Sequence, residues 1–97
     1  MQSLFPPTIQ ERFAAFDLAH PEVYAAFVDV AEQLLASGHR HYSADAIMHV
    51  VRFHRDVNRS RDGGFKINDH FSSRYARKLM ETDARFANFF ATRALSG

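Results

Sequence analysis

The chain has 97 residues, 46% of them hydrophobic and ten of them phenylalanine, which is enough apolar material for the core of one small domain. The absence of cysteine excludes disulfide bonds, thiolate zinc sites and a cysteine nucleophile. The lack of a basic start or of a long uninterrupted apolar run predicts a cytoplasmic protein with no signal peptide and no membrane span. The net charge of +1 does not by itself indicate a nucleic-acid partner.

The first half of the chain contains two segments with helical periodicity. Residues 9–19 follow Thr8, a favourable N-cap, and carry apolar residues at one-turn intervals. This helix should end before Pro21, because a residue that precedes proline avoids the helical region. Residues 21–38 predict a second helix, with the proline in its first turn and Gly38 as its C-terminal stop.

A third helix is predicted over residues 44–58. Ser43 is its N-cap, and Asp45 in the first turn favours the positive end of the helix. The residues expected to share its core face are Ile47, Val50, Val51 and His54, with Met48 at the edge. On this interpretation His54 is a half-buried core residue.

Residues 58–67 are expected to form an arm between helices. Gly63 and Gly64, with polar residues around them, disfavour a helix and predict a loop. The end of the arm, residues 65–67, alternates in a way that predicts a short extended segment.

Two more helices are predicted after the arm. Either Asn68 or Asp69 caps a fourth helix over residues 70–81. Asp83 caps a short fifth helix over residues 84–95, where phenylalanines recur at helical intervals.

The predicted fold is therefore an all-α single domain over residues 1–97, with about five helices and one short extended insert. Residues 1–7 are expected to be flexible. The third and fourth helices resemble a helix-turn-helix pair, but about ten residues separate them, whereas that motif uses a turn of three or four. A helix-turn-helix variant with an inserted arm is the form that this sequence allows.

Charge is divided unevenly between the two halves. Residues 1–49 carry two basic and six acidic residues, a net charge of −4, and residues 50–97 carry ten basic and five acidic residues, a net charge of +5. This asymmetry predicts one acidic and one basic surface. Two alternatives are that folding interleaves the halves or that the asymmetry drives head-to-tail self-association.

The basic residues concentrate on the fourth helix and on the arm that leads into it. Arg74, Arg77 and Lys78 are three and four residues apart, so they share a helix face opposite the apolar residues. Ser73, near the start of that helix, suits contact with phosphate. The complete set of candidate binding residues is Arg52, Arg55, Arg59, Arg61, Lys66, Ser73, Arg74, Arg77 and Lys78.

This set favours nucleic-acid binding, with DNA as the preferred ligand, by a homodimer. Guanidinium groups make bidentate contacts with phosphates and with guanine edges, as a recognition helix requires. The competing interpretation is a basic helix face that is merely solvated.

Catalytic chemistry has little support in the sequence. Six histidines invite a metal site, but His49 and His54 are five residues apart and point to different faces of one helix, while a helical zinc pair needs a spacing of four. His39 and His41 are expected in a polar turn between helices. The triad order and the glycine-rich phosphate loop are also missing, so we predict no enzyme activity, no metal and no cofactor.

Several blocks of the sequence resemble a group of small uncharacterised phage and prophage proteins. The matching blocks are YSADAIMHVVRFHRDV, FKINDHFSSRYARKLM and FANFFATRAL, within about residues 42–95. The chain departs from the group's pattern at Asp69 and His70, where an asparagine-rich cap is usual. The resemblance implies a viral context and an accessory role in a host cell, and it assigns no site residues.

That context provides an alternative function. A phage-encoded protein could use the same arginine surface to bind and inhibit a host protein, for instance a defence complex. The sequence leaves both possibilities open.

Overall fold

The computed structural model describes residues 6–58 and 67–91. In this part of the chain the protein is all-α, as predicted, with four α-helices, two 3₁₀ turns and no strand. The α-helices are α1 (Ile9–Ala19), α2 (Pro21–Ala36), α3 (Ala44–Asn58) and α4 (Ser72–Thr82), and the 3₁₀ turns are η1 (Asp69–Phe71) and η2 (Ala84–Phe86). Residues 1–5, most of the predicted arm and residues 92–97 lie outside the described residues.

The structure confirms three predicted N-caps, Thr8, Ser43 and Asn68. Thr8 and Glu11 form a capping box at α1, in which the Thr8 hydroxyl accepts from Glu11 N at 3.1 Å and Thr8 N donates to the Glu11 carboxylate at 2.9 Å. Ser43 Oγ accepts from Ala46 N at 3.2 Å at the start of α3. Asn68 Oδ1 accepts from His70 N at 2.8 Å and caps η1, which leads directly into α4.

Helix α2 ends as the sequence predicts. Gly38 has a φ of 95°, in the left-handed region that favours glycine. In this conformation His39 N donates to Leu34 O at 3.0 Å, which satisfies a carbonyl in the last turn of the helix.

The prediction of a fifth helix over residues 84–95 is wrong for its described part. Asp83 does cap the segment, because its carboxylate accepts from Arg85 N at 3.0 Å, but only the 3₁₀ turn Ala84–Phe86 forms. Residues of the α2–α3 loop bind the carbonyls that a continuing helix would use. Tyr42 N donates to Phe89 O at 3.1 Å, and the His41 ring contacts Asn88 O at 3.0 Å.

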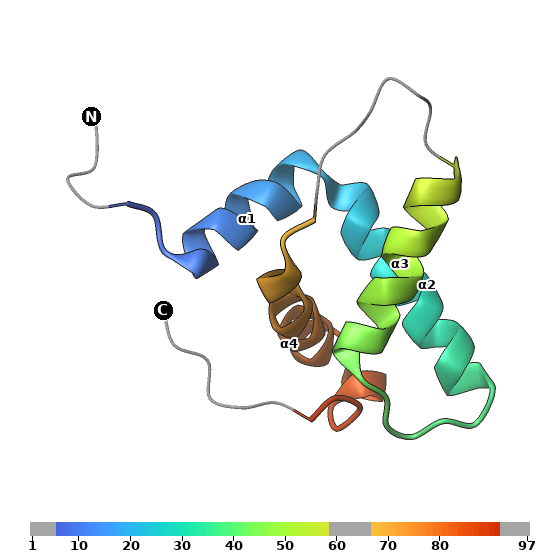
Figure 1. Cartoon of the computed structure of the whole chain (residues 1–97). Helices are drawn as coiled ribbons and strands as arrows, with labels where there is room; N and C mark the ends of the chain where they lie inside the picture. The colour runs from blue at the N-terminus through green and yellow to red at the C-terminus, as the bar shows by residue number, and fades with distance from the viewer. Residues whose placement is uncertain (1–5, 59–66, 92–97) are drawn as a thin grey trace.

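Helix α4 occupies the centre of the fold. Figure 1 shows it between α1 on one side and α3 on the other, with η2 at its end. Tyr75 and Leu79 of α4 are fully buried, and α3 packs against both α2 and α4. The core is rich in aromatic rings: Phe13 meets Tyr75 edge-on at 4.8 Å between ring centroids, and Phe27 lies 5.7 Å from Phe90.

The core face of α3 differs from the predicted one. Ile47, Met48 and Val51 are its buried residues, so Met48, predicted at the edge of the core face, is fully buried. Val50 is 36% exposed, and His54, predicted to be half-buried, is exposed. Helix α3 is therefore rotated relative to the prediction, and its contacts with α2 and α4 bury the side on which Met48 lies.

Candidate functional site

Two of the three cations on α4 point toward α1. Arg74 is only 7% exposed and donates from Nε to Gln10 Oε1 at 3.1 Å. Lys78 Nζ lies 2.5 Å from Asp17 Oδ2 and 4.1 Å from the centroid of the Tyr24 ring. These contacts hold α1 against α4, so the prediction of a solvent-facing basic side is wrong for Arg74.

The third cation, Arg77, is more open. Its side chain is 51% exposed, and Nε lies 3.4 Å from Glu81 one turn further along the helix. Ser73, Arg77 and Glu81 form the exposed stripe of α4, which is narrow because α3 packs against the helix and Arg74 and Lys78 contact α1. The neighbouring Ser72 is buried and donates its hydroxyl to the Asp45 carboxylate of α3.

An open groove of roughly 690 Å³ lies between α1 and α4. Its α4 wall carries the three cations, and its α1 wall includes Ala14 and the 85% exposed side chain of Leu18. Asp17 and Glu81 also line the groove, so most of the positive charge is balanced inside it.

The other described candidate residues lie on α3, apart from this groove. Arg52 Nη2 is 3.5 Å from the Asn68 carbonyl, at the point where the chain enters η1, and Arg55 lies half-buried one turn further along. Arg59, Arg61 and Lys66 lie outside the described residues. The described candidates thus occupy two elements: α4, where Arg74, Arg77 and Lys78 line the groove, and the C-terminal half of α3.

The structure favours the second interpretation of the charge asymmetry, in which folding interleaves the two halves of the chain. Ion pairs join the acidic first half to the basic second half. Asp17 pairs with Lys78, and Glu32 pairs with Arg85 at 2.7 Å. Both carboxylates come from the acidic half and both cations from the basic half. Two cations of the basic half are therefore paired with carboxylates of the acidic half.

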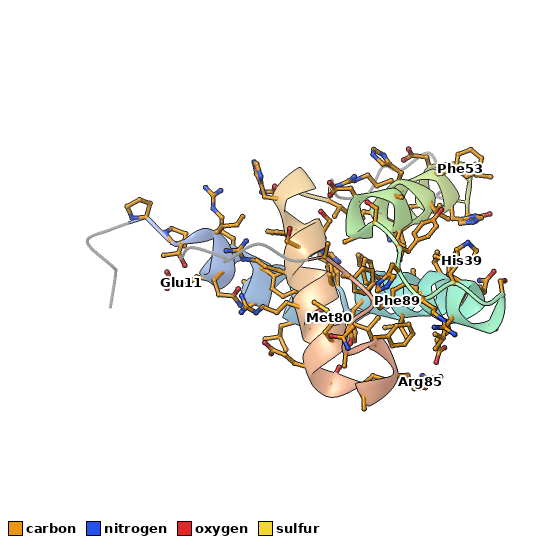
Figure 2. The ribbon with its side chains drawn as sticks, turned by 90° about the horizontal axis from the view of Figure 1, so that it is seen from below. Glu11, His39, Phe53, Met80, Arg85 and Phe89 are labelled. Carbon is orange, nitrogen blue, oxygen red and sulfur yellow. The ribbon has the colours of Figure 1, made fainter. Side chains whose placement is uncertain are left out.

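Helix α3 presents an apolar stripe to solvent that the sequence interpretation missed. Its members, Ala46, Val50, Phe53 and Val57, are spaced four, three and four residues apart. Phe53 is 63% and Val57 64% exposed. Figure 2 shows Phe53 on the outer side of α3, pointing away from α2. We call these four residues the α3 stripe.

A signal for the α3 stripe was present in the sequence. Helix α3 carries apolar residues on two faces. A surface helix of a small domain buries only one of its faces, so the other apolar face stays exposed to solvent. Val50, expected in the core beside Ile47, belongs to the second apolar face, together with Phe53 and Val57.

The described residues contain no cluster of three or more His, Cys, Asp or Glu side chains that could hold a metal ion. His39 and His41 lie in the α2–α3 turn as predicted, and each contacts a backbone carbonyl, Leu34 O at 3.3 Å and Asn88 O at 3.0 Å. Across residues 6–58 and 67–91, no helix is long and apolar enough to cross a membrane.

Comparison with known protein families, curated proteins and solved structures finds no match to this chain. The functional interpretation therefore rests on the geometry of the α1–α4 groove and the α3 stripe.

Proposed function

We propose that this protein is a non-enzymatic binding domain that docks a protein partner on the outer side of α3. The observation that carries the proposal is the α3 stripe, in which Val50, Phe53 and Val57 are 36%, 63% and 64% exposed. A row of large apolar side chains in contact with water is a feature of interaction sites, and an aromatic residue at its centre is the usual energetic anchor.

The three cations of α4 already contact other side chains of the protein, which supports a protein partner over nucleic acid. A helix that reads DNA must offer its basic side chains to the ligand. Arg74 is buried against Gln10, Lys78 is paired with Asp17, and Arg77 lies beside Glu81. Nucleic acid would have to compete with these contacts at three adjacent positions.

The resemblance to small phage and prophage proteins adds a cellular context to the proposal. The domain would act in the cytoplasm of a host cell as an accessory protein, and inhibition of a host protein is the form that this context favours. The α3 stripe then takes the place of the arginine surface as the main contact.

Affinity capture with matched variants tests the proposal. Tagged wild-type protein, Phe53→Asp and Leu18→Asp are incubated with lysate of the natural host. Leu18 is the control because it is an equally apolar, 85% exposed residue on α1. We expect wild type and Leu18→Asp to retain the same stoichiometric protein and Phe53→Asp to lose it. Equal capture by all three proteins would contradict the proposal.

Nucleic-acid binding remains the second candidate function because five basic residues follow one another closely in the sequence, from the C-terminal half of α3 onward. These residues are Arg52, Arg55, Arg59, Arg61 and Lys66. Fluorescence anisotropy with duplex DNA, single-stranded DNA and RNA at two salt concentrations decides this question. Affinity that falls steeply with salt, and that disappears in an Arg59→Ala, Arg61→Ala, Lys66→Ala triple variant, would favour this second function.

A further inference from the structure

The α3 stripe has the residue spacing of a helix that pairs with another helix. Intervals of four, three and four residues are those of the core positions of a coiled coil, in which each side chain fits between four residues of the facing helix. The stripe lies on the side of α3 opposite the buried Ile47, Met48 and Val51, so a second helix can approach it without disturbing the core.

The residues beside the stripe are complementary to themselves in one orientation. His49 and Asp56, both exposed, are seven residues apart and lie along the same edge of the stripe. When two copies of α3 run antiparallel, His49 of one copy lies alongside Asp56 of the other, and the twofold symmetry repeats this pair. An imidazole N–H can then donate to a carboxylate at both ends of the contact.

The apolar residues match in the same register. The antiparallel arrangement that joins His49 to Asp56 places Val50 against Phe53 of the second copy, and the small Ala46 against Val57. Each large side chain therefore faces a smaller one. A parallel arrangement would instead stack Phe53 on Phe53 and would bring His49 next to His54 of the second copy, with no acid opposite it.

We infer that the α3 stripe is a self-association surface, on which a second copy of this chain packs its own α3 antiparallel to form a symmetric dimer. This inference rests on the proposed function, because it places a second copy of the chain on the same surface, where that copy and a host protein would compete. Helix α3 is only about 22 Å long, so the contact is small and the dimer should dissociate in the micromolar range.

Sedimentation equilibrium over a wide concentration range tests the inference. We expect wild type and Leu18→Asp to approach twice the chain mass at high concentration. Phe53→Asp should weaken the dimer by at least about thirty-fold, as expected for loss of a central aromatic anchor. Circular dichroism should show unchanged helix content, because Phe53 lies outside the core. A wild type that stays monomeric at hundreds of micromolar, or a Phe53→Asp variant that dimerises normally, would overturn the inference.

A charge exchange tests the orientation. His49→Glu places a carboxylate opposite Asp56, and Asp56→Lys places a cation opposite His49, so each single variant should weaken the dimer. The double variant His49→Glu, Asp56→Lys recreates an ion pair in the antiparallel register and should restore dimerisation. A double variant no tighter than either single one would overturn the antiparallel pairing.

The two proposals can fail separately. If the wild type is monomeric while Phe53→Asp still loses a captured host protein, the self-association is wrong and the protein-binding function stands. If the wild type is monomeric and all variants capture the same proteins, both proposals are wrong.

Discussion

Tyr75 lies within a cluster of three other aromatic rings in the core. It is fully buried, and Phe13, Tyr24 and Phe27 pack around its ring with centroid distances of 4.8, 6.1 and 5.8 Å. Its hydroxyl is buried with no hydrogen-bond partner among the described residues. Burial, with the negative charges of Asp17 and Glu22 as weaker causes, raises the pKa of Tyr75 well above its usual range.

Replacement of Tyr75 by phenylalanine should leave the free energy of unfolding unchanged or raise it by up to about 1 kcal/mol, because a buried hydroxyl without a partner costs desolvation energy. Tyr24→Phe is the matched control, since the Tyr24 hydroxyl bonds Thr82 Oγ1 at 3.2 Å, and we expect a loss of about 0.5–1 kcal/mol. Urea denaturation measures both. A clear destabilisation by Tyr75→Phe would show that its hydroxyl has a partner.

The same residue should make the protein sensitive to alkali. The unfolded chain releases the Tyr75 proton near pH 10, whereas the folded protein retains it, so the free energy of unfolding falls as the pH rises above about 10. Thermal denaturation of wild type and Tyr75→Phe at increasing pH isolates this contribution. The decline should be shallower in the variant, and equal slopes would contradict the prediction.

At the scale of the elements, α1 is held on α4 by polar contacts around an aromatic centre. The Phe13 ring of α1 lies 4.8 Å from the Tyr75 ring of α4, and the Lys78–Asp17 and Arg74–Gln10 contacts join residues that line the groove between the two helices. The Asp17 side chain is 14% exposed, so its carboxylate depends on Lys78 for compensation.

Lys78→Ala should lower the free energy of unfolding by about 1–3 kcal/mol, since it leaves the Asp17 carboxylate shielded from water and unpaired. Arg77→Ala, one position earlier, removes an exposed ion pair with Glu81 and should cost no more than about 0.5 kcal/mol. Chemical denaturation of the two variants gives the comparison. Equal losses would mean that Lys78 is a surface cation and not a link between helices.

At the scale of the whole molecule, opposite charges join segments that are far apart in the chain. Arg85 lies 2.7 Å from both Glu32 on α2 and Asp83 at the start of η2. Hydrogen bonds from Arg85 hold the pKa of Asp83 below its ordinary value, and those from Thr8 do the same for the pKa of Glu11. The ion pair between Arg85 and Glu32 connects the C-terminal part of the described chain to its first half.

Acid should therefore weaken the fold through Asp83. A carboxylate whose pKa is lowered in the folded state contributes stability at neutral pH that is lost as the pH falls below about 4. Asp83→Asn keeps a side-chain oxygen for the cap but removes the charge, so its thermal midpoint should fall less steeply between neutral and acid pH. An acid slope identical to that of the wild type would refute this role.

The sequence alone determined where most helices begin and end. The hydrogen bonds of Thr8, Ser43, Asn68 and Asp83 all join residues two or three positions apart, so local chemistry is sufficient to predict them. It also placed Arg74, Arg77 and Lys78 on α4. It could not show that Lys78 would meet Asp17, 61 residues away in the chain.

Tertiary structure decided which helix faces became core and which became surface. Apolar residues on two sides of α3 were compatible with more than one rotation of the helix, and packing on α2 and α4 selected Ile47, Met48 and Val51. That choice left Phe53 in solvent. It depends on long-range packing, because burial of one face is favourable only when a neighbouring element covers it.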